Sequence, residues 1–313
     1  MTEHVLGRDQ IHFRWDNSLE PAIEIEPGDV VHGRAREVTN GSITRASSVA
    51  DLTKEGFGFH YPLAGPVGVA GAEPGDALEI EILDLRPDVW GWNGVPPGIG
   101  LLKEDFPGPF LQHWDLSNGV TTELKPGIVI PLEPFCGVMG VAPTERGEHR
   151  VLTPGIFGGN IDIRHLNVGA RLLLPVQVPR ALFSVGDCHA VQGDGELCAA
   201  IECAMDFSLR FHLHKGANLS GPQFWTRRGA HLTRHDTEQG YFATTGVGPD
   251  LYEDAKEAVR AMISWLTANQ DLTREEAYVL CCAVLDLKIS EIVNPPNWIV
   301  SAYLPLTIFH DRP

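Results

Sequence analysis

The chain lacks the features that would point to a membrane or a nucleic acid. None of its apolar runs approaches the roughly 20 residues that a transmembrane helix needs. Its first residues, MTEHVLGRDQ, have neither the basic nor the apolar region of a secretory signal. Basic residues are scarce, 24 against 41 acidic ones, and a net charge of −17 argues against DNA or an anionic membrane as a partner. We therefore expect a cytoplasmic protein with no nucleic-acid or membrane partner.

Two further patterns are missing. The six cysteines show no short-spaced arrangement of the kind that disulfide-rich scaffolds use. In a reducing compartment such cysteines are buried apolar residues, so we expect no structural disulfides. No Gly-x-Ser-x-Gly motif occurs, which argues against a serine triad on a strand-to-helix elbow.

What remains is typical of an enzyme-sized globular protein. The 313 residues, 43% hydrophobic and 21% charged, are enough for one large domain or two smaller ones with a sizeable core. The acidic balance suits a neutral or cationic small-molecule ligand. Chains of this size commonly form symmetric assemblies, so we expect a homo-oligomer.

Phrases that read as a turn followed by a strand recur through the first two thirds of the chain. They are EPGDVV (26–31), EPGDALEIEI (73–82), KPGIVIPL (125–132) and NVGARLLLPV (167–176). Pro followed by Gly meets the requirement of a type II turn. Within the second phrase, Leu78, Ile80 and Ile82 alternate with polar residues and should face a core. Residues 1–220 are therefore predicted to form a mainly β unit, a β-sandwich or a partly open, jelly-roll-like barrel that carries the functional site.

Helical patterns come late in the sequence. Apolar residues at helical spacing predict a helix over about 250–268. The Thr-x-x-Glu capping box at 273–276 predicts a second helix, over about 273–288. A strand-like segment follows from Trp298. Residues 221–313 are thus predicted to be an α+β portion, packed on the sandwich as one unit.

Residues that can carry chemistry gather between Phe157 and Glu202. In an extended chain Asp187 and His189 point to the same side, so they can share one ion. After the turn that follows, a returning strand would bring Glu196 or Glu202 back toward this pair. One imidazole with two or three carboxylates is a nitrogen and oxygen set that suits zinc and also admits manganese or calcium.

The same stretch resembles the acetamidase/formamidase family of metal-dependent amidases. That family's signature runs GGN-x-D, an apolar LPV strand, FSVGD-x-H-x-x-QGDGE and a final IE, and every element is present here. The resemblance extends through HFRWDNSLEP (12–21), EDFPGPFLQHWDL (104–116) and PFCGVMGVAP (134–143). It implies a hydrolase that cleaves the C–N bond of short linear amides, such as acetamide or formamide, to a carboxylate and ammonia. Related chains act on other small or cyclic amides.

On this hypothesis a divalent metal, zinc by preference, would be held by Asp162, Asp187, His189 and Glu202. Glu202 is the first choice for general base if it is not a ligand, and Glu196 is the next. Asn160 or backbone N–H groups would hold the oxyanion. We expect a small pocket lined by Phe157, Trp225 and Tyr241.

Two alternatives stay open at this stage. A thiolate at Cys188, beside His189, or at Cys136 could attack an amide carbonyl, although strand alternation turns Cys188 away from the site. A noncatalytic binding module stabilised by calcium is the other, but His189 argues against the all-oxygen ligand set of such a site. His32 and His212 are weaker candidates for additional ligands.

Overall fold

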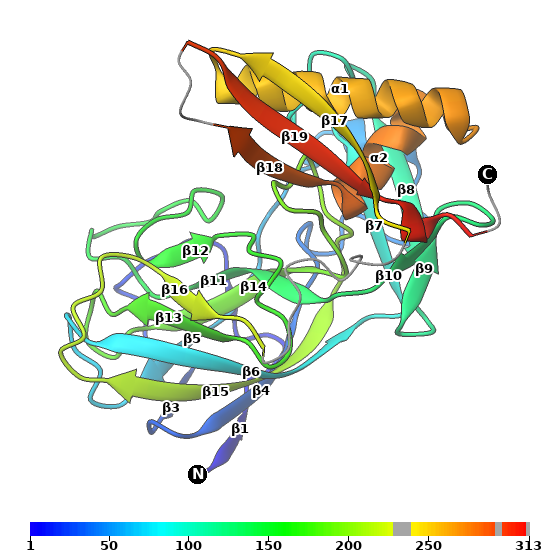
Figure 1. Ribbon diagram of the computed structural model, residues 1–313. Helices are drawn as coiled ribbons and strands as arrows, with labels where there is room; N and C mark the ends of the chain where they lie inside the picture. The colour runs from blue at the N-terminus through cyan, green and yellow to red at the C-terminus, as the bar shows by residue number, and fades with distance from the viewer. Residues whose placement is uncertain (228–238, 292–295, 311–313) are drawn as a thin grey trace.

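The structure, a computed structural model, describes residues 1–227, 239–291 and 296–310. Two open β-sheets form the lower part of the molecule in Figure 1, and a smaller layer with both α-helices lies above them. The mainly β prediction is confirmed, in its sandwich form, because no sheet within the described residues closes into a barrel. The division of the chain at residue 220 stays a prediction.

The first sheet has the strand order β1-β4-β15-β6-β13-β16. These strands are Glu3–Val5, Val30–Ala35, Met205–His214, Ala77–Pro87, Arg171–Pro175 and Gln223–Trp225. Only the β1–β4 pair in this sheet is parallel. The Pro-Gly turns do not join these neighbours, because those at residues 27–28 and 74–75 carry the chain from strands of the second sheet into β4 and β6.

The second sheet has the order β12-β11-β14-β5-β2, and β3 also pairs with β5. The strands are Gly158–Asn160, Phe135–Gly140, Phe183–His189, Leu63–Val69, Ile11–His12 and Ile23–Ile25. Strand β14 is central here and is buried along its whole length. A strand buried on both faces is a stable platform for side chains that must keep a fixed geometry.

The two sheets share one apolar core. Leu78, Ile80 and Ile82 of β6 are buried, as the alternation predicted. Phe183 of β14 packs edge-on against Phe211 of β15, with ring centroids 5.2 Å apart, which joins the two sheets directly.

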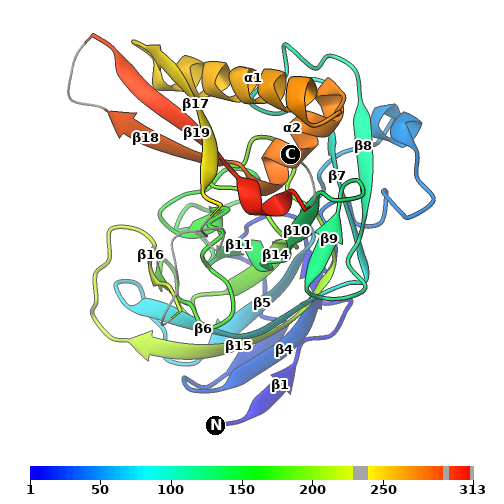
Figure 2. The same cartoon turned by 45° about the vertical axis from the view of Figure 1, so that its right-hand side comes forward.

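Two antiparallel strand pairs lie on the right of the molecule in Figure 2 and reach up beside the helical layer. The described residues also form two short 3-10 helices. The bounds of these elements are Trp90–Val95 (β7), Phe110–Asp115 (β8), Thr121–Glu123 (β9), Val129–Pro131 (β10), Val49–Thr53 (η1) and Leu306–Ile308 (η2). No helix among the described residues has the length and apolar character needed to cross a membrane.

The upper layer is a three-stranded sheet, β17-β19-β18, with helix α1 lying along it (Figure 1). Its elements are Tyr241–Gly248 (β17), Leu251–Asn269 (α1), Arg274–Val284 (α2), Asp286–Glu291 (β18) and Trp298–Pro305 (β19). Gly246 lets α1 approach β17, because a Cβ there would lie 1.9 Å from the Asp254 carbonyl oxygen. Phe242 stacks on Trp265 at 4.1 Å and fixes the same contact.

The first predicted helix is confirmed, and the second begins with the predicted capping box. The Thr273 hydroxyl accepts from the Glu276 N–H at 3.2 Å, and the Glu276 carboxylate accepts from the Thr273 N–H at 2.9 Å. The prediction that this helix continues to about residue 288 was wrong, since α2 ends at Val284. Leu285 is extended, and Asp286 starts strand β18 by pairing with β19. Pairing with a distant strand overrides the local helical pattern.

Helix α2 and strand β18 also hold the loop that follows β14. The Tyr278 hydroxyl donates to the Leu197 carbonyl at 2.7 Å, and the Leu287 N–H donates to the Asp194 carbonyl at 2.9 Å. Gly193 lies so close to this layer that a Cβ would be 2.0 Å from the Leu285 carbonyl oxygen. The upper layer therefore fixes the position of a loop that carries two acidic residues.

Candidate active site

Strand β14 places Asp187 and His189 on one face, as its alternation predicts. His189 is fully buried, and its Nε2 lies 3.5 Å from Asp187 Oδ1. Cys188 points the other way, and its Sγ lies 3.4 Å from Cys136 Sγ on β11. Neither thiol therefore faces His189, and all six cysteines are free.

Glu202 reaches the same pair from the segment that returns antiparallel to the end of β14. Its Oε2 lies 3.4 Å from His189 Nε2. The position is fixed by the backbone, because an antiparallel bridge joins His189 to Glu202 and a second joins Trp92 to Glu202. The predicted local assembly is thus present, although most of the returning segment is irregular and is held by the upper layer.

Asp162 and Glu196 approach His189 from two further loops. One ligand atom from each of Asp162, His189 and Glu196 lies within 4.8 Å of the others, and the same holds for Asp187, His189 and Glu202. His189 is therefore common to two overlapping groups. Asn160 Nδ2 donates to Asp162 Oδ2 at 2.7 Å and orients that carboxyl.

Gly137 on β11 makes the space in which these side chains meet. A Cβ at this position would lie 2.4 Å from Asp162 Oδ1 and 2.9 Å from His189 Cε1. Phe135, two residues earlier, packs edge-on against the His189 ring at 5.0 Å. Sequence reasoning missed Gly137, although its place in the Pro-Phe-Cys-Gly motif of the family resemblance was a usable signal.

The electrostatics of the site are dominated by burial without a compensating Lys or Arg. Within the described residues, none of Asp162, Asp187, Glu196 and Glu202 forms an ion pair with a Lys or Arg side chain. Burial raises the pKa of Glu196 to about 7 and that of Glu202 to about 8. It also raises the pKa of Asp162, with further repulsion from Glu196 and Asp187. Burial opposes protonation of His189, but the charges of Glu202 and Asp187 outweigh it and raise the His189 pKa.

Several buried polar atoms of this cluster make no hydrogen bond. They are both ring nitrogens of His189, Oδ1 of Asp162, Oε2 of Glu202, Oδ1 of Asn160 and Oε1 of Gln192. Buried polar atoms left unpaired cost stability, so such a concentration indicates a bound group that satisfies them. An imidazole with carboxylates is the donor set of zinc and of harder divalent ions, and the residues therefore fit a metal.

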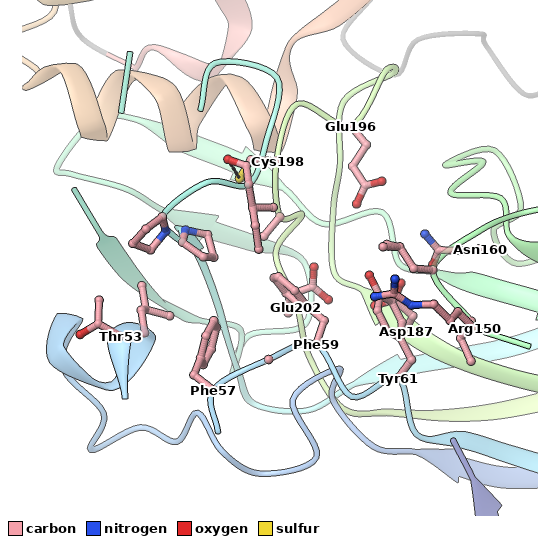
Figure 3. Close-up of a pocket in the computed structure, with 18 of the residues that line it drawn as sticks. Thr53, Phe57, Phe59, Tyr61, Arg150, Asn160, Asp187, Glu196, Cys198 and Glu202 are labelled. Carbon is pink, nitrogen blue, oxygen red and sulfur yellow. Dashed lines mark hydrogen bonds between the residues drawn. The ribbon is translucent and has the colours of Figure 1, made fainter. Parts of the chain in front are cut away.

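The cluster opens into a cavity of about 800 Å³, shown in Figure 3. Asp187, Glu196, Glu202 and Asn160 line one part of it, and Phe57, Phe59 and neighbouring apolar residues line another. Tyr61 lies beside Asp187 in Figure 3. Burial, with the charges of Asp187 and Glu202, raises the pKa of Tyr61, so its hydroxyl stays neutral.

Other expectations about the pocket were wrong. The expected lining residues Phe157, Trp225 and Tyr241 pack elsewhere, against Trp15, Arg171 and Tyr303 respectively. Phe57, Phe59 and Tyr61 supply the aromatic wall instead, and no local pattern marked them because they come from a loop far away in the sequence.

The two additional histidines lie outside the site. His32 bonds to Ser208 at 2.8 Å, and His212 lies 3.7 Å from Glu81, both in the first sheet. Asp194 is also turned away, toward Arg164 and His165.

The sandwich brings the buried imidazole of His189 together with two buried and two half-buried carboxyls beside a cavity, a set of groups that fits the active site of a hydrolase. Comparison with known proteins identifies the family. The profile of the "Acetamidase/Formamidase family" matches residues 2–149 and 146–311, nearly the whole chain. The chain belongs to this family.

Individual relatives agree with that assignment. The formamidase of Methylophilus methylotrophus is 27% identical, over 96% of this chain and 89% of that protein. The solved structure of a gamma lactamase from Delftia acidovorans superposes with a TM-score of 0.89 at 27% identity, covering 99% of this chain and 94% of that one. An acetamidase from Bacillus halodurans gives a TM-score of 0.67 at 30% identity, with 97% of both chains covered.

Proposed function

We propose that the protein hydrolyses the C–N bond of short linear amides, of the acetamide or formamide type, to a carboxylate and ammonia. The observation that carries this proposal is the buried group of His189 with Asp187 and Glu202, whose unpaired atoms fit a divalent metal. Family membership supplies the reaction class. A purely structural calcium site would not need a buried imidazole.

Asp187, His189 and Glu202 would hold the ion, and Asp162 would complete the set. Such an ion, when bound, polarises an amide carbonyl and lowers the pKa of water. Zinc suits a site with an imidazole nitrogen and carboxylate oxygens, and manganese or calcium are the alternatives. The contact of Glu202 with His189 favours Glu202 as a ligand over its other expected role as the base.

Glu196 is then the proposed general base. Its pKa of about 7, raised by burial, is matched to proton transfer near neutral pH. Glu196 takes a proton from the attacking water and passes it to the leaving nitrogen as the C–O bond forms and the C–N bond breaks. Asn160, whose amide group also orients Asp162, is the proposed donor of a hydrogen bond to the carbonyl oxygen.

A second candidate reaction is the opening of a small cyclic amide at the same site. It is favoured by the TM-score of 0.89 with the gamma lactamase, against 0.67 with the acetamidase. Ring opening makes the same bond changes, but the nitrogen stays attached to the product. A lactamase reaction therefore releases no ammonia.

The test is turnover of formamide, acetamide, propionamide and a γ-lactam by native, chelated and zinc-resupplied protein. Ammonia is measured for the linear amides, and the new primary amine is measured for the lactam. Turnover that chelation abolishes and zinc restores supports the proposal and ranks the two reactions. Turnover that survives chelation contradicts the metal and points to Cys136 or Cys188, and no turnover of any amide favours the binding module.

We also propose a cytoplasmic location and a homo-oligomer. The first rests on the free cysteines, which suit a reducing compartment. The second rests on chain size alone. Sedimentation velocity measures the oligomeric state directly.

A further inference from the structure

Two arginines stand opposite each other on the wall of the same cavity. Trp15 and His149 form an antiparallel bridge, with reciprocal N–H to carbonyl bonds of 3.0 and 2.8 Å. In antiparallel register the next pair is Arg14 and Arg150. Both residues are exposed, and both line the cavity that contains Asp187, Glu196 and Glu202.

Neither of these guanidinium groups has an acidic partner. The chain has 41 acidic and 24 basic residues, and Arg34, Arg180 and Arg260 each contact two carboxylates. Within the described part of the chain, Arg14 and Arg150 form no ion pair, and the Arg14 guanidinium donates a hydrogen bond only to the Phe13 carbonyl. The third cation of the cavity, Lys54, is already paired with Asp51.

Two guanidinium groups without acidic partners, on paired segments, lower the stability of the protein, and a bound anion would remove this loss. Like charges directly opposite on paired strands are destabilising. A guanidinium group matches the two oxygens of a carboxylate in a bidentate geometry, and two such groups can share one anion. The pair is therefore suited to an anionic group that the ligand supplies.

The cavity is also too large for acetamide alone. A volume of about 800 Å³ is in the range that holds drug-sized ligands. Figure 3 places Arg150 beside Asp187 and Asn160, whereas Phe57 and Thr53 lie on the other side of Glu202. The remaining wall is apolar and is lined by Leu52, Phe59, Pro96, Pro97 and Ile99.

From these observations we propose that the physiological substrate is an amide with an apolar body and a carboxylate, and that Arg14 and Arg150 bind this carboxylate. The inference rests on the proposed amidase function and adds the class of substrate. It also replaces the expectation of a neutral or cationic ligand, because a strongly acidic chain can attract an anion only where cations are gathered.

The experiment compares two amides that differ only in a charged group. 4-Carboxyphenylacetamide and 4-methylphenylacetamide both release ammonia, so one assay of the metal-supplied protein gives kcat/KM for each. We expect wild type to prefer the carboxylate by about tenfold or more, because charge-assisted hydrogen bonds are the strong ones. The double substitution R14M/R150M should bring the ratio close to one, and R14K/R150K should retain part of the preference.

Arg146→Met is the matched control, since Arg146 is exposed in the same loop as Arg150 and does not line the cavity. It should keep the wild-type ratio. Turnover of both amides with a ratio near one in wild type overturns the inference but leaves the amidase proposal intact.

If neither amide is turned over, acetamide turnover in the same preparation decides whether the amidase proposal stands. The arginine pair is then judged by calorimetric binding of the two amides to wild type and R14M/R150M. Tighter binding of the carboxylate by wild type alone supports the pair, and equal affinities overturn it.

Discussion

Two clusters of acidic residues, each drawn in part from the loops at 160–165 and 192–196, differ in whether an arginine accompanies them. In one cluster Arg164 lies 3.2 Å from Asp286 and 3.4 Å from Asp194. In the other, Asp162 and Glu196 stand two residues away from Arg164 and Asp194, and both have His189 as a neighbour. The first cluster ties both loops to strand β18, and the second stays without compensating charge. Residues held at such a cost, and with shifted pKa values, mark a functional site.

The largest effect should come from removing the residue common to both ligand groups. His189→Gln should lower kcat/KM for acetamide about 10³-fold or more, because the metal and its several kcal/mol of transition-state stabilisation are lost. The metal-free variant should be less stable than metal-free wild type in urea unfolding, because Asp187 and Glu202 lose the buried imidazole that contacts them. Full activity in this variant would remove His189 from the mechanism.

A substitution in the cluster that contains Arg164 should lower the stability of the protein rather than its activity. Asp286→Ala removes a buried carboxylate that lies 3.2 Å from Arg164 and should lower the free energy of unfolding by about 3 kcal/mol, as measured by urea denaturation. The control is Asp84→Ala, which breaks an exposed pair with Arg86 and should cost less than about 1 kcal/mol. Equal losses in the two variants would contradict the anchoring role of Asp286.

Metal-free protein should also show that Glu196 and Glu202 titrate in the opposite direction to Asp194, which lies beside Arg164. Burial raises the pKa of Glu196 to about 7 and that of Glu202 to about 8, so their protonated forms stabilise the fold below the unfolded value of 4.5. This contribution is lost as the pH rises through 7 and 8. Asp194 behaves in the opposite way. Burial raises its pKa, but the hydrogen bond from His165 and the charge of Arg164 lower it further, so its contribution is lost on acidification.

Thermal unfolding between pH 5 and 8 measures this difference. Metal-free wild type should lose more stability over that range than the double variant E196Q/E202Q, whose side chains do not ionise. If stability falls with pH equally in the two proteins, the raised pKa values of Glu196 and Glu202 are contradicted.

The smallest effect is expected from a substitution of Cys188, on the face of β14 that points away from the site. Cys188→Ala should leave kcat/KM within about threefold of wild type and should cost about 1 kcal/mol of stability, because the thiol packs against Cys136 away from the site. Loss of turnover with intact metal content would revive a cysteine nucleophile.

The parts that could be predicted from the sequence depend on short-range geometry. Alternation placed Asp187 and His189 on one face of a strand, and the same rule turned Cys188 away from them. The Pro-Gly turns predicted antiparallel β structure, and the capping box at Thr273 predicted the start of α2.

The parts that could not be predicted depend on contacts between distant segments. The end of α2 was missed because Asp286 joins a sheet and an ion pair with Arg164, 122 residues away. Arg14 and Arg150 line the same cavity because Trp15 pairs with His149. Nothing in the local pattern of either segment indicates its partner, since strand pairing is set by the whole fold.

The central claim is that the acidic cluster around His189 binds a divalent metal through Asp187, His189 and Glu202. The most direct measurement is the metal content of purified wild type and of His189→Gln, after zinc supply and desalting, by inductively coupled plasma mass spectrometry. The account predicts about one ion per wild-type chain, removed by chelation, and much less than one in the variant. Equal content in the two proteins, or a wild type that retains no metal, would contradict it.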